Sequence, residues 1–196
     1  ANSVQIIKDI DSLIEYTGYV CDETQPIHKQ KNNNIYVSTG LNKDESVVIF
    51  KKIAEIAHHY PEHKFIMPIA NKYNSMGGRK NKNIYLVEYV PELRSKLTEC
   101  AAYITYGGYN ATVEILKSKV PAIVIPRQSG RKMEQFVRAF TFEPYDFFKV
   151  LTMQEFGGIK LVLDQLISGY SPKPFTYNLQ GTSNTADILS EIYNEL

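Results

Sequence analysis

The sequence predicts an α/β domain in which a doubly wound, Rossmann-like parallel sheet of about six strands is covered by helices on both faces. Short apolar, strand-like runs alternate with helical patterns through most of the chain. The links between them are mostly short, as expected for parallel βαβ units with right-handed crossovers. The length of 196 residues suits one domain with a full core.

The first half of the chain predicts three strands, over 35–38, 64–70 and 83–90. A helix is expected over 41–60, because its apolar residues recur at helical spacing and Asn42 with Glu45 forms a capping box. Pro61 ends that helix. The polar, glycine-rich stretch 71–83 has no periodicity and predicts an exposed loop.

The second half predicts three further strands, over 101–106, 120–126 and 146–151. Helical patterns follow over 92–100, from Tyr109 onward, and over 133–140, 153–168 and 184–196. Pro91 fits the first turn of the first of these helices. Thr152 and Glu155 form a capping box before the helix over 153–168.

Ligands of such sheets bind beyond the carboxyl ends of the strands, where the strand order reverses. The loops expected there are 38–46, 87–93, 105–114 and 125–135.

Composition excludes several classes of function. Lysine and arginine (22) nearly balance aspartate and glutamate (21), so no general basic field exists to bind nucleic acid. No apolar run approaches the ~20 residues that cross a bilayer, so any membrane contact would be peripheral. The two cysteines form no disulfide framework and no signal-peptide pattern begins the chain, which favours a cytoplasmic setting.

A zinc site is not expected at the histidine pair His59 and His63. Pro61 lies between them and prevents a shared helical face.

The segment TYGGYNATVEI (105–115) predicts an anion site. Gly107 and Gly108 directly follow a strand, and Tyr109 and Asn110 start a helix. Glycines allow backbone to approach a ligand closely. The unpaired N–H groups at the helix start attract a phosphate, with ~0.3 to 2 kcal/mol from the helix dipole alone.

Glu114 extends this prediction to a nucleotide. An acid one turn into the helix points back toward the bound group, where it would repel phosphate. It would accept hydrogen bonds from a ribose diol, each worth ~1.5 to 3 kcal/mol. The alternative is that the glycines are an ordinary turn device and that Glu114 is favoured by the helix dipole alone.

Glu134 and Gln135 form a second candidate group. An acid beside an amide can accept from and donate to the hydroxyls of a sugar. The alternative is a first-turn acid beside a solvent-facing glutamine.

From Tyr106 to Ala139 the chain carries the pattern GGYN…E…PR…EQ…RA. The pattern resembles the nucleotide-sugar-binding half of GT-B glycosyltransferases, in the branch of the lipid II N-acetylglucosaminyltransferase and the plant monogalactosyldiacylglycerol synthases. Within that branch it is most similar to predicted glycosyltransferases with the same pattern. Coarser similarity extends from about Thr17 to the end. There, YTGYV resembles the segment that closes the amino-terminal half, and VSTG resembles the first loop of the second half.

The resemblance implies a role for each candidate residue. Diphosphate contacts fall on Gly107, Gly108, Tyr109, Asn110, Ser38, Thr39 and Gly40, the ribose contact on Glu114, base contacts on Val87, Glu88, Tyr89 and Val90, and donor-sugar contacts on Glu134, Gln135 and Arg127. The loop 38–40 has one glycine where relatives often have two or three, which weakens its expected closure over phosphate. Arg127 either touches the ligand or anchors its loop.

The resemblance also implies a missing partner. Residues 1–24 correspond to an interdomain linker remnant and 25–196 to the nucleotide-sugar-binding domain. The acceptor site and the catalytic base belong to an amino-terminal domain or subunit, so this chain alone is expected to bind nucleotide without transferring sugar. The reaction implied is an inverting transfer from a nucleoside-diphosphate sugar, with UDP the expected nucleotide, no metal and no cofactor.

Two alternatives stay open. UDP-N-acetylglucosamine 2-epimerases use a similar nucleotide half, although their chemistry needs a proton-abstracting set in the cleft and the PR…EQ…RA pattern favours a transferase. A non-catalytic nucleotide-binding module would keep the fold without the chemistry.

Overall fold

The computed structural model describes residues 14–22, 30–40, 43–68, 81–127, 133–169 and 177–195. These residues form one six-stranded sheet in the order β3-β2-β1-β4-β5-β6. The strands are β1 (Asn34–Ser38), β2 (Lys64–Pro68), β3 (Ile84–Val87), β4 (Ala102–Thr105), β5 (Ala122–Val124) and β6 (Phe148–Val150). All neighbouring strands pair in parallel, which confirms the predicted doubly wound sheet.

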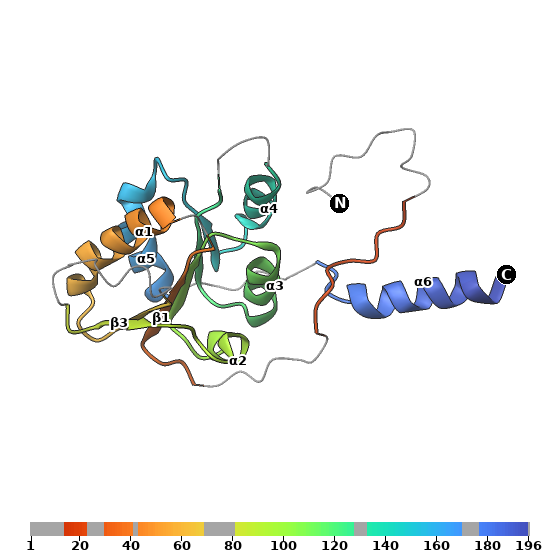
Figure 1. The fold of residues 1–196 in the computed structure, drawn as a ribbon, viewed down its shortest axis with the longest axis horizontal. Coiled ribbons are helices and arrows are strands. Elements are labelled where there is room, and N and C mark those ends of the chain that lie inside the picture. Colours follow the sequence, from red (N-terminus) through yellow and green to blue (C-terminus); the bar gives the residue numbers. More distant parts are fainter. Residues whose placement is uncertain are drawn as a thin grey trace.

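Helices cover both faces of the sheet (Figure 1). They are α1 (Lys43–Ile56), α2 (Leu93–Leu97), α3 (Tyr109–Ser118), α4 (Glu134–Phe142), α5 (Ile159–Ile167) and α6 (Gly181–Glu195), with 3-10 helices η2 (Ala57–His59) and η4 (Phe156–Gly158). Helices α1 and α5 lie on one face, and α2, α3 and α4 lie on the other. Helix α6 projects away from the sheet, beside residues 14–22, which we call the linker segment.

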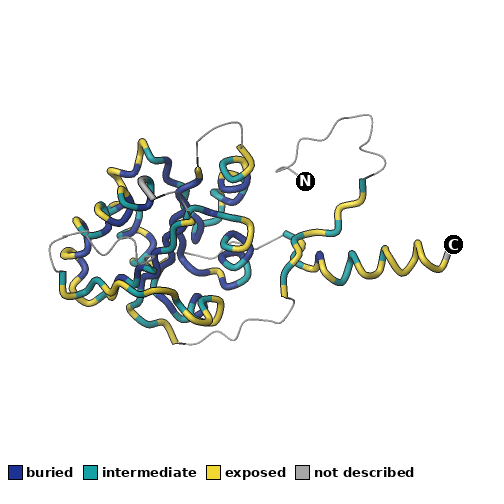
Figure 2. Tube along the Cα trace, in the orientation of Figure 1, coloured by how far each residue is buried: buried dark blue, intermediate teal, exposed yellow. Residues whose placement is uncertain are grey.

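Each face of the sheet buries its own core (Figure 2). Ile35 and Val37 of β1 point into the core under α1 and α5, whereas Tyr36 points into the core under α2, α3 and α4. This alternation of two buried faces is expected for a parallel sheet. It explains why the strands appear in the sequence as nearly continuous apolar runs.

The helix predicted over 41–60 is α-helical only to Ile56 and continues as η2 to His59. Helices α2, α5 and α6 also start at residues other than those predicted. Glu92 adopts a left-handed conformation (φ 50°), so α2 starts at Leu93 and Pro91 lies outside its first turn. Thr152 and Glu155 make the capping-box hydrogen bonds, but these close a turn before η4, and α5 begins only at Ile159. Helix α6 begins at Gly181, before the predicted start at residue 184.

Some predicted features lie outside the described residues. They are the cap at Asn42 and most of the loops 71–83 and 127–132. Among the described helices, none is long and apolar enough to cross a membrane.

The strand order reverses between β1 and β4, at the centre of the sheet. From β1 the chain moves outward to β2 and β3, then returns through α2 to β4 and continues to β5 and β6. A crevice forms at such a switch point, between the loops that leave the two central strands. The candidate site lies there.

Candidate functional site

The switch point brings the two predicted phosphate loops to one edge of the sheet. Ser38 at the end of β1 pairs with Thr105 at the end of β4. Ser38 Oγ and the Tyr103 hydroxyl share a 2.5 Å hydrogen bond, and the Thr39 hydroxyl donates to Ser46 Oγ of α1 (2.8 Å). Burial raises the pKa of Tyr103, partly offset by its bond to Ser38. The loop after β1 is therefore fixed to β4 and to α1.

Gly107 has an internal steric role. Its φ of +74° is a conformation that side chains disfavour, and an added Cβ would lie 2.5 Å from Val124 Cγ1 of β5. Sequence reasoning assigned this glycine to ligand approach. In the structure, the sharp exit from β4 and the packing on β5 already require it.

Tyr106 lies between the two loops. An added Cβ at Gly40 would lie 2.3 Å from Cε1 and Cζ of the Tyr106 ring, and one at Gly108 would lie 2.7 Å from its hydroxyl oxygen. The phenol thus packs against both glycines, and the missing Cβ of Gly40 makes room for it. Sequence analysis did not select Tyr106, although an aromatic residue between a strand end and a glycine pair is a usable signal.

The start of α3 has the geometry of an anion site. Tyr109 and Asn110 begin the helix as predicted and are exposed. Gly108 is the N-cap residue, and within the described chain no side chain caps the helix. The first-turn amides therefore carry the positive end of the helix dipole without a side-chain acceptor.

Glu114 points toward α2 and pairs with Arg94. Arg94 Nε lies 2.5 Å from Glu114 Oε1, and Arg94 Nη1 lies 3.3 Å from Asp22 Oδ2 of the linker segment. The side chain of Glu114 is only 17% exposed, whereas that of Arg94 is 58% exposed. Arg94 was missed by sequence analysis, because an exposed arginine on a short helix gives no local signal.

The predicted base segment, Val87–Val90, connects β3 to α2. Val90 packs with Leu93 against the core on the α2–α3 side, and Tyr89 is exposed. The segment leads into α2, which packs beside α3, the helix that carries Glu114, the residue predicted to bind ribose. Its contact with a base stays a prediction.

The predicted sugar residues lie at the start of α4 and on the loop before it. Glu134 pairs with the buried Arg138 one turn later. Gln135 follows Glu134, and the exposed Arg127 lies with its Nε 3.8 Å from Glu45 Oε2 of α1. Arg127 thus ties the end of the β5 loop to α1, in line with an anchoring role.

Two buried polar atoms on α4 lack hydrogen-bond partners among the described residues. They are Gln135 Oε1 and Arg138 Nε. Leaving such an atom unpaired costs about 1 to 3 kcal/mol, so each is expected to take a partner that the described residues do not supply, either a water or a ligand group. Burial also lowers the pKa of Arg138, while nearby Tyr19 and Tyr109 act in the opposite direction.

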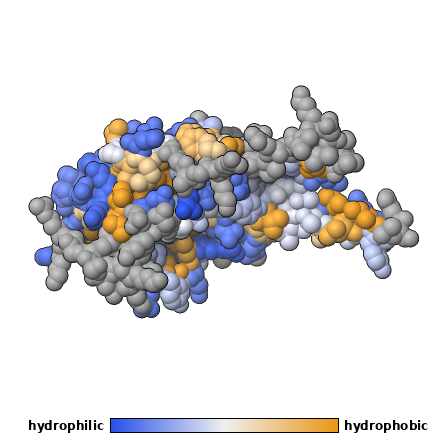
Figure 3. Space-filling model, turned by 45° about the horizontal axis from the view of Figure 1, so that its top comes forward, coloured by the Kyte–Doolittle hydropathy of each residue, from blue (hydrophilic) through white to orange (hydrophobic). Residues whose placement is uncertain are grey.

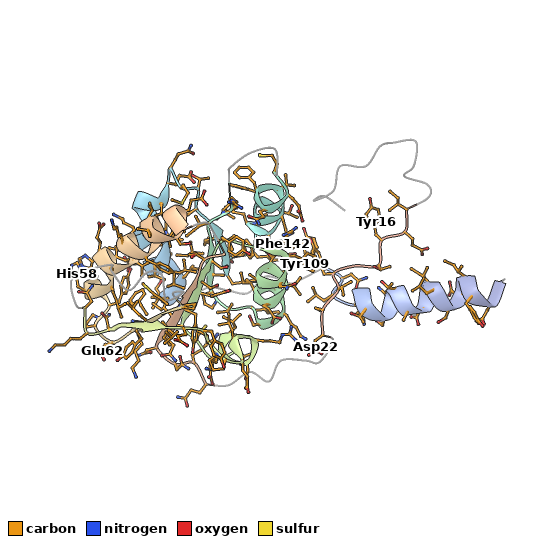
Figure 4. The ribbon with its side chains drawn as sticks, viewed as in Figure 1. Tyr16, Asp22, His58, Glu62, Tyr109 and Phe142 are labelled. Atoms are coloured by element: carbon orange, nitrogen blue, oxygen red, sulfur yellow. The ribbon has the colours of Figure 1, made fainter. Side chains whose placement is uncertain are left out.

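The linker segment packs against the start of α3. The Val20 amide donates to the Tyr109 hydroxyl (2.9 Å), and the rings of Tyr19 and Tyr109 lie 5.9 Å apart. Arg138 lies over the Tyr109 ring, 5.4 Å from its centroid. Tyr19 also packs against Phe142 of α4, with ring centroids 5.8 Å apart, and Figure 4 labels Tyr109, Phe142 and Asp22. The first turn of α3 is therefore held from two sides.

The fold is that of the Rossmann-like domain of a GT-B glycosyltransferase. The glycosyltransferase family 28 C-terminal domain matches residues 17–162, and the chain belongs to this family. Comparison with curated proteins gives no match. Among the described residues, no group of three His, Cys, Asp or Glu side chains could hold a metal ion.

Several solved structures share the fold. The calicheamicin glycosyltransferase CalG4 has a TM-score of 0.59 at 18% identity, over 85% of this chain and 40% of its own. MurG from Acinetobacter baumannii has a TM-score of 0.58 at 12% identity, over 83% of this chain and 51% of its own. A Listeria monocytogenes protein described as a UDP-N-acetylglucosamine 2-epimerase has a TM-score of 0.52 at 14% identity, over 85% of this chain and 47% of its own. The chain spans about half or less of each.

Proposed function

We propose that this chain is the donor-binding domain of a glycosyltransferase that uses a nucleoside-diphosphate sugar, with UDP the preferred nucleotide. The observation that carries the proposal is the uncapped start of α3 at the switch point, with Glu114 one turn into the helix. The amides would hold the diphosphate and Glu114 the ribose. Family membership supports the same assignment.

The donor sugar would lie toward the start of α4. The buried, unpaired Oε1 of Gln135 can accept from a sugar hydroxyl, and the exposed Glu134 carboxylate can accept another. Gly107, Gly108, Tyr109 and Asn110 would face the diphosphate, with Ser38, Thr39 and Gly40 opposite. The base would contact Val87–Val90. Arg127 would anchor its loop or reach the ligand.

The proposed reaction is a direct displacement at the anomeric carbon with inversion. Negative charge develops on the departing diphosphate, and the fixed amides of α3 would stabilise it without a metal or other cofactor. The catalytic base and the acceptor site would belong to an amino-terminal domain or subunit. This chain alone would bind the donor without transferring sugar.

The linker segment and α6 would form part of the contact with that partner. Leu189, Ile192 and Tyr193 of α6 are each more than half exposed, and Figure 3 shows a hydrophobic area on this projecting part of the molecule. Hydrogen bonds fix the start of α6 beside the linker segment, including Gly181 N to Tyr19 O (3.1 Å). An apolar helix face that projects from the domain favours burial by a partner.

Isothermal titration calorimetry with UDP, GDP, ADP and the corresponding sugar nucleotides tests the proposal. We expect UDP to bind most tightly. Glu114→Ala should weaken UDP roughly ten- to hundredfold, and Gln135→Ala should weaken the UDP-sugar more than UDP. Equal binding of UDP and 2′-deoxy-UDP by the unaltered chain would show that the ribose role is wrong.

An epimerase is the second candidate, because this chain shares its fold with the Listeria monocytogenes structure described as a UDP-N-acetylglucosamine 2-epimerase. Joining the chain to its amino-terminal half and assaying sugar transfer, hydrolysis and epimerisation would separate the two activities. A chain that binds UDP but gives no turnover in any of these assays would favour a non-catalytic module. We propose a reducing, cytoplasmic setting, because two cysteines in 196 residues are too few for a disulfide framework.

A further inference from the structure

We infer that Arg94 positions Glu114 for ribose recognition and that Asp22 of the linker segment holds Arg94 in place. The inference rests on the proposed function, because it concerns the same ribose site. Arg94 is a positioning residue in this scheme and need not touch the nucleotide. Nothing in the family pattern GGYN…E…PR…EQ…RA includes it.

The geometry of the guanidinium allows both contacts at once. Nε lies 2.5 Å from Glu114 Oε1, and Nη1 lies 3.3 Å from Asp22 Oδ2. An arginine presents donors in a planar fork, so two acids can bind at different edges of the same group. A lysine has a single point charge and cannot reproduce this arrangement.

The contact fixes one oxygen of the Glu114 carboxylate. An ionised carboxylate has about four acceptor sites on two oxygens, so Oε2 can still accept from a ribose hydroxyl. A free glutamate must lose side-chain freedom when it binds the diol. With Arg94 in place, this cost has been met before the nucleotide arrives, which is the usual basis of preorganised binding.

The linker segment holds the arginine because its own backbone is anchored on both sides of Glu114. Lys117 Nζ, three residues further along α3, donates to the backbone oxygen of Asp22. The Val20 amide donates to the hydroxyl of Tyr109 at the start of α3. Lys117 is the nearest cation to Glu114 on α3, but it is directed at the linker segment. Of Lys117 and Arg94, only Arg94 pairs with Glu114.

Stability is a weak explanation for this network. Arg94 is 58% exposed and the Asp22 side chain is 43% exposed, and ion pairs with such exposure contribute little to folding. Glu114 is the enclosed member, at 17%. The contact therefore matters most for the direction in which an enclosed carboxylate points.

The test is calorimetric titration of the chain with UDP and with 2′-deoxy-UDP, in the unaltered protein and in four variants. Arg94→Ala should weaken UDP roughly five- to thirtyfold while changing 2′-deoxy-UDP much less, so that the discrimination between them collapses. Arg94→Lys should restore part of the discrimination, and Asp22→Asn should reduce it by a smaller factor. Lys96→Ala, which removes a positive charge from the same helix, should leave both affinities unchanged.

The outcomes separate this inference from the function on which it rests. Unaltered protein that binds UDP no better than 2′-deoxy-UDP overturns both. Unaltered protein that discriminates, with an Arg94→Ala variant that discriminates equally, overturns the role of Arg94 alone. Tighter UDP binding by Arg94→Ala would also overturn it, since Arg94 would then occupy the ribose position. Thermal unfolding of each variant checks that the fold is intact.

Discussion

Replacing Gly40 by alanine should destabilise the domain by about 0.5 to 1.5 kcal/mol, the usual cost of pushing a side chain off its preferred rotamer, because Gly40 is exposed and the group in the way is the end of the Tyr106 side chain. The new Cβ would lie 2.3 Å from Cε1 and Cζ of Tyr106 and 2.4 Å from its hydroxyl oxygen. Gly40 has no positive φ, so the cost would come from this contact and not from backbone strain. The ring would have to leave its position between the two loops.

A double-mutant cycle isolates this contact. Tyr106→Ala removes the ring and should lower stability by itself. In that background, Gly40→Ala should add less than about 0.5 kcal/mol, because the group it would strike is gone. The coupling energy should then be about 0.5 to 1.5 kcal/mol. Since the chain has no tryptophan, urea unfolding is best followed by far-UV circular dichroism.

Gly157→Ala is the matched control. An added Cβ there meets nothing within 4 Å. Alanine should therefore change stability by less than about 1 kcal/mol, in the stabilising direction, by restricting the unfolded chain. The claim that Tyr106 packs between the loops would be wrong in either of two cases. Gly40→Ala would change the free energy of unfolding as little as Gly157→Ala, or it would cost the same with and without the Tyr106 ring.

Three further predictions concern stability and reactivity. Burial raises the pKa of the Cys100 thiol to about 12, so a disulfide reagent should modify it only after urea unfolding, and rapid modification of the native thiol would contradict this. Thr152→Ala should cost about 1 kcal/mol in urea unfolding, because Thr152 closes the turn before η4, whereas an unchanged midpoint would exclude a capping role. Hydrogen bonds from Lys160 and Tyr60 hold the pKa of Asp164 below its ordinary value of 3.8. The associated stabilisation is complete above that value and lost as the pH falls below it. Asp164→Asn should therefore weaken the pH dependence of the melting temperature below about pH 4.

The order of elements could be predicted because the central strands β1, β4 and β5 are buried on both faces and most helices have one apolar side. The start of α3 at Tyr109 followed from the same pattern, since the glycine pair separates a continuous apolar run from a helical one. The start of α5 could not be predicted in this way. The bonds between Thr152 and Glu155 are present, but they close a turn that leads into η4, and the distinction between a 3-10 turn and an α-helix depends on the packing that follows.

The sequence predicted the positions of the site residues better than their structural roles. Gly107 was selected from the sequence as a residue that lets backbone approach a ligand, and Gly40 because its loop resembles a phosphate-side loop of the family. Their steric partners, Tyr106 and Val124, come from other parts of the chain, and sequence adjacency does not reveal them. Arg94 is a further case, because its partner Glu114 lies on another helix.

The two acids predicted to bind the donor share one arrangement. Glu114 pairs with Arg94, which also contacts the linker segment, and Glu134 pairs with Arg138. Arg138 lies over the ring of Tyr109, whose hydroxyl accepts a hydrogen bond from the linker segment. Arg94 by itself therefore connects Glu114 to the linker segment, and Arg138 with Tyr109 connects Glu134 to it. We propose that the linker segment joins this domain to the other half of a two-domain enzyme, so that it would change position when the cleft closes. Its displacement would then release or tighten the partners of both acids together, and donor recognition would depend on the position of the other half.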